Sequence, residues 1–423
     1  MPGEEPADGP LFLRTRERYN RPDSASEVPL MKVSLFYLPT IGSRRDIEAG
    51  MAGFREDLYQ QMLAELKEQA QLADDLGYQS ISFTEHHFHI EGFEISNNPI
   101  LLDLFIALNT KRIRVGQLGI VLPAHNPLQI AEDLAMVDHM TGGRLDVGFA
   151  RGYQRRWVDV MAQHYHNVHG VQPGQHDEVD QANREAFEEC YRIIKLAWTE
   201  DMFSFQGKFW KIPPEGTPWP LAATRQWGAG VDEEGTLRQI GVVPKPLQKP
   251  HPPIFQPFAS SEATIRWCAR EGITAILPPM YLQLQNYLYE VYREEAYRHG
   301  RRLPEGEGLG LLRDVVVTDS DEEAVRLWLE GPAFVGAAWF APFGFDRVLR
   351  EPGRESNLTP QELMDRSLVL VGSPDTVSFQ LERLLKHTPV SWLFAWTYNG
   401  VIPHHKLMRS LELFATRVLP RFQ

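Results

Sequence analysis

Short strand-like runs and longer helix-like runs alternate along almost the whole chain, and this alternation is the strongest constraint on its fold. The strand-like runs are rich in β-branched and aromatic residues, whereas the helix-like runs repeat apolar residues every three to four positions. The expected strands cover residues 32–38, 80–84, 113–121, 144–149, 252–256, 274–277, 309–317 and 391–397. The expected helices cover about 56–76, 99–109, 127–140, 181–199, 261–271, 282–299, 321–330, 376–387 and 404–417.

Eight strands separated by helices predict an α/β fold in which a parallel sheet closes on itself, the (β/α)8 or TIM barrel. The alternative is an open doubly wound sheet, but its usual Gly-x-Gly-x-x-Gly turn is absent after residues 32–38. Long insertions at residues 152–180, 200–250 and 331–375 are expected to form lids or pocket walls at the carboxyl-terminal face of the barrel. Within them, residues 213–243 are better described as a surface excursion.

Composition limits the class of protein. The net charge is −13 over 423 residues, which argues against binding nucleic acid or an anionic membrane, because both require a basic face. No apolar run approaches the roughly 20 residues of a transmembrane helix. Residues 31–423 are expected to form one domain, and residues 1–30 a flexible extension without the apolar core of a signal peptide. The two cysteines, Cys190 and Cys268, predict a reducing, cytoplasmic compartment and no disulfide framework.

A cluster of histidines, Glu85-His86-His87-Phe88-His89, follows the second expected strand. In α/β proteins this carboxyl edge of the sheet is where ligands bind. Consecutive strand residues point to opposite faces, so His86 and His87 cannot both reach one site from a regular strand. His87 and His89, together with Glu85, could do so, which makes a metal-dependent barrel hydrolase one alternative. Neither cysteine lies near these residues, and we expect no metal.

Arg151 follows the fourth expected strand and is flanked by Gly148 and Gly152. Its position predicts that the guanidinium emerges at the carboxyl face of the barrel, where the glycines allow a ligand to approach the backbone. The planar guanidinium suits a phosphate, because it donates two parallel hydrogen bonds. The alternative interpretation is a salt bridge across the barrel rim.

Hydroxyl side chains gather between the strand at 252–256 and the helix at 261–271. Ser260, Ser261 and Thr264 stand at the start of this helix, where free backbone N–H groups favour an anion. Ordinary N-capping explains the serines equally well. With Arg151 on the same face, phosphate binding becomes a second explanation.

Two glycines, Gly116 and Gly119, interrupt the expected strand at 113–121. Glycine weakens the interior of a strand and often marks a bulge or a ligand lying against the backbone. A simple correction of strand twist is the other interpretation.

Taken together, these motifs resemble those of the bacterial luciferase-like flavin monooxygenases, over almost the whole chain from Met31 to Gln423. The resemblance lies in the order and spacing of several short motifs rather than in any one of them. The motifs are Glu85-His86-His87-Phe88, Leu122-Pro123 through Ala131-Glu132-Asp133, Asp138, Gly142-Gly143-Arg144, Arg151-Gly152, Val371-Gly372-Ser373-Pro374, and Leu411-Glu412-Leu413-Phe414 through Val418-Leu419-Pro420.

The resemblance implies a TIM barrel that binds reduced FMN (FMNH2), lets it react with O2 at the flavin C4a to form a peroxide, and oxygenates a small organic, mainly apolar substrate. The chain contains no second nucleotide-binding fingerprint, so the resemblance also implies that a separate flavin reductase supplies the FMNH2. A homodimer is expected on the same ground.

The resemblance also implies roles for individual residues. The expected cofactor-binding residues are Leu118, Gly119, Arg151, Tyr153, Ser260, Ser261 and Thr264, with a non-proline cis peptide between the first two. The expected catalytic residues are His86, Glu85 and His87, of which His86 handles protons and Glu85 orients a histidine. The alternative interpretation of His86 is a hydrogen-bonded structural histidine at the rim. The aromatic residues that offer an apolar surface to the substrate are Phe88, Tyr153, Trp339, Phe340, Phe343 and Trp396.

The chain departs from the family pattern at two places. Luciferase has a cysteine where this chain has Ala150, and the usual His-Pro is replaced by Asn126-Pro127, with His125 displaced by one position. Both departures argue against inferring luminescence. A deazaflavin (F420)-dependent oxidoreductase of the same superfamily is the near alternative, although that branch carries a Gly-x-Gly run where this chain has residues 149–152. A non-catalytic flavin-binding relative is a third possibility.

Overall fold

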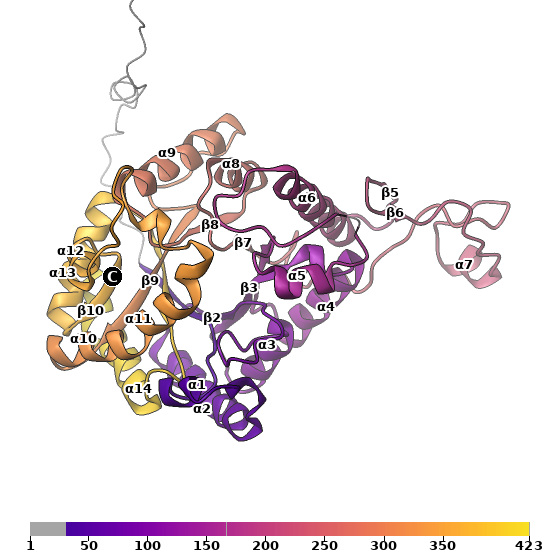
Figure 1. Cartoon of the computed structure of the whole chain (residues 1–423). Helices are drawn as coiled ribbons and strands as arrows, with labels where there is room; N and C mark the ends of the chain where they lie inside the picture. The colour runs from indigo at the N-terminus through magenta and orange to yellow at the C-terminus, as the bar shows by residue number, and fades with distance from the viewer. Residues whose placement is uncertain (1–30, 166, 423) are drawn as a thin grey trace, which may run out of the picture.

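The computed structural model describes residues 31–165 and 167–422, so the extension expected at residues 1–30 lies outside the described residues. Its centre is a closed ring of parallel strands, as the TIM-barrel prediction requires (Figure 1). The ring closes because β9 pairs with β8 on one side and with β11 on the other. Its members, in order, are β1 (Lys32–Tyr37), β2 (Ser80–Phe83), β3 (Arg114–Val121), β4 (Leu145–Ala150), β7 (Ile254–Gln256), β8 (Thr274–Leu277), β9 (Leu309–Val317) and β11 (Trp392–Thr397), and each lies at a predicted strand.

One further strand, β10 (Val369–Gly372), has no counterpart in the sequence-based prediction. It pairs with the second half of β9, from Asp314 to Val317, whereas β11 pairs with Leu311 to Asp314 of β9. The strand has four residues, too few for periodicity to distinguish it from a buried loop.

The helices surround the ring (Figure 1). Local chemistry fixes their ends: Asn126 accepts a hydrogen bond from the Leu128 N–H in front of α4, and Gly77 ends α2 with a φ of 81°. The helices are α1 (Arg44–Glu48), α2 (Glu56–Leu76), α3 (Pro99–Leu108), α4 (Pro127–Met140), α5 (Arg155–Met161), α6 (Glu178–Thr199), α7 (Ala222–Trp227), α8 (Glu262–Glu271), α9 (Leu282–Arg298), α10 (Asp321–Glu330), α11 (Pro332–Val335), α12 (Pro360–Asp365), α13 (Pro374–His387) and α14 (His404–Leu413). The predicted helices all appear, while the short α1, α5, α7, α11 and α12 were not predicted.

Adjacent strand residues divide between two apolar cores. Leu35 belongs to a cluster that joins the strands to the outer helices, whereas its neighbour Phe36 belongs to a second cluster. The second cluster draws on alternate residues of several strands and therefore fills the inside of the ring. Its strand members include Phe36, Leu118, Phe255, Ile276, Leu312 and Phe394.

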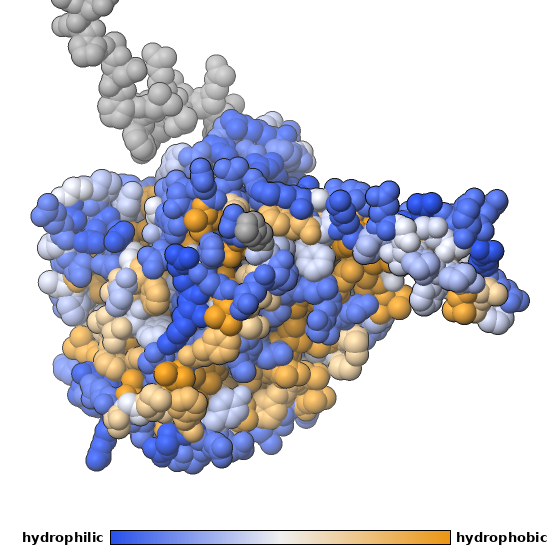
Figure 2. All heavy atoms as spheres, turned by 45° about the vertical axis from the view of Figure 1, so that its right-hand side comes forward, coloured by the Kyte–Doolittle hydropathy of each residue, from blue (hydrophilic) through white to orange (hydrophobic). Residues whose placement is uncertain are grey.

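The long insertions differ in where they leave the barrel. Residues 151–177 follow β4 and carry α5, and residues 331–368 carry α11, a π-helical turn (Gly336–Phe340) and α12. Residues 200–253 instead follow α6, so they leave from the opposite, amino-terminal end of the barrel. They contain the two-stranded β5 (Phe205–Gln206) and β6 (Lys211–Ile212) and helix α7. This arm projects away from the barrel (Figure 1), and most of its visible surface is hydrophilic (Figure 2).

Two composition-based expectations can be compared with the structure. Cys190 and Cys268 are both free and buried, in agreement with the expected lack of a disulfide framework. Within residues 31–165 and 167–422, none of the helices combines the length and the apolar character that crossing a lipid bilayer requires.

Candidate functional site

A cavity opens at the carboxyl-terminal end of the barrel strands, bordered by β3 and by the segments that follow β2, β4 and β7. Most of the residues that the sequence analysis assigned to catalysis or cofactor binding lie in its wall. These are Glu85, His86, Leu118, Gly119, Arg151, Tyr153, Ser260, Ser261 and Thr264. His87, the remaining predicted catalytic residue, does not line the cavity.

The start of α8 supplies hydroxyl groups to this wall. Ser261 caps the helix: its Oγ accepts a hydrogen bond from the Thr264 N–H at 3.3 Å and donates one to Thr264 Oγ1 at 2.9 Å. The first N–H groups of a helix have no partners within the helix, and the helix dipole is positive at this end. Ordinary capping is therefore present, and it coexists with a site suited to an anion.

Two arginines border the same cavity, Arg151 after β4 and Arg184 on α6. Arg184 is half-buried, and within the described part of the chain no group hydrogen-bonds to its guanidinium. Burial and the adjacent charge of Arg151 lower the pKa of Arg184 from its ordinary value, although Asp180 and Glu188 oppose this change. Two cations held close together in this way favour an anion between them. The sequence analysis missed Arg184, because its position on a helix carries no local signal.

Arg151 already has one anionic partner. Its Nη1 donates a hydrogen bond to Asp180 Oδ1 at 2.7 Å, and the Asn183 side chain donates one to the Arg151 carbonyl at 3.0 Å. The salt bridge offered as an alternative therefore exists. Arg151 has further N–H donors, so this salt bridge leaves it able to bind a second anion.

The floor of the cavity includes Leu118 and Gly119, and the peptide bond between them is cis. The register between β3 and β4 shifts at this point, between Gln117 and Ile120. A Cβ atom placed on Gly119 would lie 2.6 Å from the carbonyl carbon of Gly148, so a side chain does not fit here. The glycine in this strand thus marks an irregularity of the ladder next to the cavity, one of the interpretations given above.

Glu85 is buried and has hydrogen bonds to both of its carboxylate oxygens. Oε1 contacts His87 Nε2 at 2.9 Å and His125 Nε2 at 2.6 Å, while Oε2 accepts the Val121 N–H at 2.7 Å. Glu85 thus contacts His87 and His125, and its role in orienting a histidine stays a prediction. The ring of His87 also packs on Trp157, with 5.0 Å between ring centroids.

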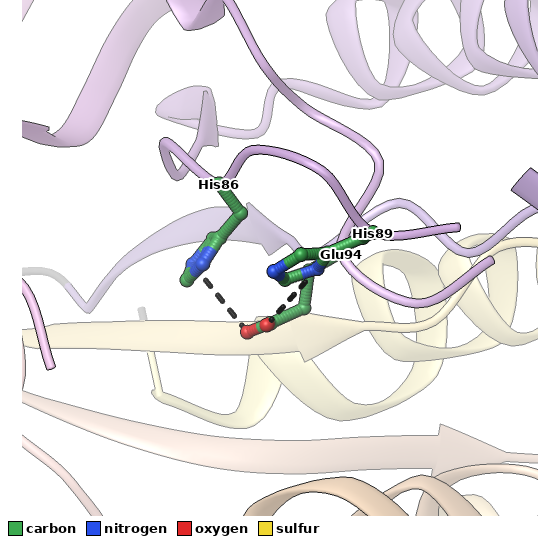
Figure 3. A group of neighbouring side chains, drawn as sticks. All are labelled: His86, His89 and Glu94. Atoms are coloured by element: carbon green, nitrogen blue, oxygen red, sulfur yellow. Dashed lines mark ion pairs between the residues drawn. The ribbon is translucent and has the colours of Figure 1, made fainter. Parts of the chain in front are cut away.

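Glu94 is a cavity residue that the sequence analysis missed. One of its oxygens, Oε1, lies 3.4 Å from His86 Nε2, and the other, Oε2, lies 3.5 Å from His89 Nδ1 (Figure 3). Oε2 also accepts hydrogen bonds from Trp339 Nε1 at 2.6 Å and Gln154 Nε2 at 2.8 Å. Burial raises the pKa of Glu94 to about 7, although these donors oppose the rise. A carboxyl group that titrates near neutral pH is suited to proton transfer.

The residues proposed for a metal-dependent hydrolase do not form one group. Glu85 and His87 belong to the cluster with His125, whereas His89 belongs to the cluster with Glu94. The ligand atoms of His86, His89 and Glu94 do lie within 4.8 Å of one another. However, His89 Nδ1 lies 2.9 Å from the Phe93 carbonyl and His89 Nε2 lies 2.6 Å from Gln154 Oε1, so both of its nitrogens are already used.

An aromatic wall covers another side of the cavity, and residues 331–349 contribute Phe340 and Phe345 to it. Of the six aromatic residues predicted to face the substrate, Tyr153 and Phe340 line the cavity. Trp339 instead stacks on Phe93, with 5.0 Å between ring centroids, and holds Glu94. Phe88 is half exposed to solvent, away from the wall. The cavity also contains apolar side chains that the sequence analysis did not select, namely Leu38, Trp157, Phe258, Phe345 and Val348.

A cavity lined by arginines, hydroxyl groups, aromatic side chains and a buried His–Glu pair, at the carboxyl-terminal end of a closed barrel, lies where barrel enzymes place their active sites. The family can be stated more closely. The chain belongs to the luciferase-like monooxygenases, because the model of that family matches residues 31–391. It is therefore an oxidoreductase of the monooxygenase type, as the resemblance implied.

Named relatives agree with this membership. The oxygenase component of a flavin-dependent trigonelline monooxygenase from Acinetobacter baylyi is 27% identical over 86% of this chain and 90% of its own length. The 3,6-diketocamphane 1,6-monooxygenase of Pseudomonas putida is 25% identical over 82% and 90%.

Solved structures show the same fold. The oxygenating constituent of 3,6-diketocamphane monooxygenase from Pseudomonas putida, solved with FMN, aligns with a TM-score of 0.70 at 23% identity, over 93% of this chain and 99% of that one. An F420-dependent tetrahydromethanopterin reductase from Methanopyrus kandleri aligns with a TM-score of 0.57 at 16% identity, over 93% and 100%. The TIM barrel is thus shared by enzymes that use different flavins.

Proposed function

We propose that this protein is the oxygenase of a two-component system, which uses reduced FMN and O2 to oxygenate a small, mainly apolar organic substrate. One observation carries the proposal: the arginines and hydroxyl groups suited to a phosphate border the same cavity as the buried pair His86 and Glu94. In this enzyme the flavin supplies the electrons that activate O2 when it is bound. The chain supplies binding, orientation and proton handling.

The phosphate group of FMN matches the anion-binding end of the cavity in charge and chemistry. Arg151 and Arg184 offer two guanidinium groups, and Ser260, Ser261 and Thr264 offer hydroxyl groups and the helix start. The charge of Arg184 is influenced by Asp180 and Glu188, but no hydrogen bond to its guanidinium occurs among the described residues, so its N–H groups can bind a phosphate. Leu118, Gly119 and Tyr153 line the same cavity and would hold the flavin ring.

Substrate binding is assigned to the aromatic wall. Phe258, Phe340 and Phe345 present apolar surface to the cavity, which favours an apolar substrate and excludes water from the reacting groups. Two relatives support a small organic substrate, since their names give trigonelline and 3,6-diketocamphane as the compounds they oxygenate.

Two protein partners follow from the proposal. A separate flavin reductase supplies the reduced flavin, and the trigonelline enzyme is likewise named as the oxygenase component of its system. A second copy of this chain forms a homodimer through α3 and α4. These neighbouring helices expose the apolar side chains Leu101, Leu108, Met136 and Met140 to solvent.

The proposal is tested by anaerobic titration of the purified protein with reduced FMN, reduced riboflavin and reduced F420. We expect FMN to bind most tightly, because riboflavin lacks the phosphate and F420 is a deazaflavin. The complex with reduced FMN is then mixed with O2 and a panel of cyclic ketones, aldehydes and N-heterocycles, and products are analysed by mass spectrometry. Incorporation of one atom from 18O2 supports the proposal. Preferential binding of F420, or no binding of any reduced flavin, contradicts it.

A further inference from the structure

His86 and Glu94 belong to the same loop between β2 and α3 and face each other in the cavity wall (Figure 3). His86 Nε2 lies 3.4 Å from Glu94 Oε1, and the two residues are 8% and 1% exposed. The other ring nitrogen of His86, Nδ1, is buried and has no hydrogen-bond partner within the described residues. Nε2 of the imidazole therefore faces a carboxylate, whereas Nδ1 is free to form a hydrogen bond with a bound molecule.

A charged imidazolium is unfavourable at this position. Burial, together with the neighbouring His89 and His87, lowers the pKa of His86 well below 6.5. At neutral pH the ring of His86 is therefore uncharged. It can still exchange a proton at Nδ1 if a second group takes or gives a proton at Nε2.

The structure holds Glu94 firmly in the position that this exchange requires. Its side chain is fixed by the Trp339 indole, the Gln154 amide and the Tyr153 hydroxyl, the last at 3.3 Å. Its backbone has a φ of 51°, a conformation that residues other than glycine rarely adopt. Such conformations persist where the surroundings impose them, often at functional sites.

We propose that Glu94 is the proton partner of His86. When a bound group gives a proton to His86 Nδ1, the proton on Nε2 passes to Glu94 Oε1, and the reverse transfer restores both residues. An N–H bond forms at Nδ1, an N–H bond breaks at Nε2 and an O–H bond forms on the carboxylate, so the ring remains neutral. This inference rests on the proposed function, in which His86 handles the protons of the reaction.

Glu85 cannot fill this role, although it adjoins His86 in the sequence. Both of its oxygens contact other groups, namely His87, His125 and the Val121 N–H. The chain thus uses two buried glutamates differently: Glu85 forms an ion pair next to the cavity, and Glu94 is available to His86.

The charged and titratable groups around His86 and Glu94 determine the pH at which the proton moves. The titratable and charged groups near His86 and Glu94 are His87 and His89 of the same loop, Tyr153 after β4, Arg156 of α5 and Tyr398 after β11. Arg156 is itself paired with Glu91, with 2.6 Å between Nη1 and Oε1.

The proposed proton exchange predicts a pH-dependent change at His86 in the protein without any flavin. Above the titration of Glu94, the carboxylate should interact with the His86 Nε2–H, whose nitrogen lies 3.4 Å from Oε1. Below it, the protonated carboxyl donates to Nε2, and the ring proton resides on Nδ1. His86 should therefore change tautomer near pH 7 without becoming charged. Nitrogen NMR of 15N-histidine-labelled protein distinguishes the two tautomers, with His86 assigned by comparison with a His86→Gln variant.

Three variants test the identity of the partner. Glu94→Gln should remove the tautomer change between pH 5 and 9. Trp339→Phe removes a hydrogen bond that lowers the pKa of Glu94, so the change should move to higher pH. Glu91→Gln, a change on the same loop outside the cavity wall, should retain it. A single His86 tautomer across this pH range, an unaltered tautomer change in Glu94→Gln, or a stoichiometric divalent ion in the purified protein overturns the proposal.

Turnover gives a second readout. With reduced FMN and an accepted substrate, Glu94→Gln should lower the rate of product formation roughly 10²- to 10⁴-fold and remove its pH dependence near 7, while flavin affinity is retained. An unchanged pH–rate profile in this variant overturns the role of Glu94. The experiments distinguish failure of the two proposals. If the protein binds no reduced flavin, the proposed function fails, whichever tautomer of His86 is found by NMR. If the protein is an active oxygenase but His86 keeps one tautomer, only the role of Glu94 is contradicted.

Discussion

His125 Nε2 lies 2.6 Å from Glu85 Oε1, so a histidine beyond the end of β3 and a glutamate beyond the end of β2 form a partly buried ion pair beside the cavity. His125 is the residue displaced by one position from the usual His-Pro of the family. Burial by itself raises the pKa of Glu85, but His125, His87 and the Val121 N–H together lower it from 4.5 to about 2. Burial lowers the pKa of His125, and Glu85 outweighs this effect and raises it above 6.5.

Replacing Glu85 with Gln should destabilise the fold in a pH-dependent manner. The depressed pKa of Glu85 contributes stability that is present above pH 4.5 and is lost as pH falls to about 2. The raised pKa of His125 contributes stability that is present below pH 6.5 and is lost as pH rises through its folded value. The loss in Glu85→Gln should therefore be largest between these limits, at roughly 3 kcal/mol.

The measurement is urea unfolding at pH 5.5 and at pH 3, where the difference between wild type and Glu85→Gln should shrink. Glu48→Gln is the matched control, because it breaks an exposed pair with Arg44 and should change the free energy of unfolding by less than about 1 kcal/mol. Equal destabilisation by Glu85→Gln at both pH values would show that the ion pair contributes no pH dependence.

The barrel could be predicted from the sequence because its signals are long and repeated. Strands of the ring and helices such as α2 or α6 carry several periods of apolar residues, and caps such as Gly77 mark their ends. The elements that were missed are short. Helix α5 has seven residues and α7 has six, which is less than two full turns of a helix.

The candidate site was predictable only where topology alone brings residues together. Arg151 directly follows β4 and Ser260 lies four residues beyond the end of β7 at Gln256, and the carboxyl ends of barrel strands necessarily meet at one face. Glu94 lies eleven residues beyond the end of β2, at Phe83, so its approach to His86 depends on the path of a loop. Arg184 lies on a helix that follows a long insertion. Neither the approach of Glu94 to His86 nor the position of Arg184 at the cavity produces a periodic pattern in the sequence.

Replacing Arg184 with Ala should weaken binding of reduced FMN roughly 10- to 100-fold, the effect of losing a charge-assisted hydrogen bond or two. Binding of reduced riboflavin should not change, because it lacks the phosphate. The free energy of unfolding should also be retained, since Arg184 has no hydrogen-bond partner among the described residues and adjoins the charge of Arg151.

Anaerobic fluorescence titration measures both flavin affinities. Arg192→Ala is the matched control on α6, where the side chain contacts the Glu188 carbonyl and the ring of Phe205 rather than the cavity. Equal weakening of FMN and riboflavin binding by Arg184→Ala would remove Arg184 from the phosphate site.

Gly148→Ala should destabilise the barrel by about 1–3 kcal/mol, the usual cost of overpacking a core. Its added Cβ would lie 2.8 Å from Leu118 Cδ2 and closer still to the Gln117 carbonyl oxygen, which belongs to the backbone of β3 and cannot move aside. Gly336→Ala provides the control, since nothing lies within 4 Å of a Cβ built there. Urea unfolding of both variants measures the difference, and equal stability of the two would refute the close approach of β3 and β4.

The proposed homodimer predicts that one charge on α3 or α4 separates the subunits. Leu108 is 74% exposed and Met140 is 55% exposed, and a glutamate at either position would be buried unpaired in an apolar interface. Leu108→Glu and Met140→Glu should therefore sediment as monomers at concentrations where the wild type sediments as a dimer. Phe379→Glu on α13, at a position that is 63% exposed, should remain dimeric. A monomeric wild type, or a Phe379→Glu variant that dissociates like the other two, would contradict assembly through α3 and α4.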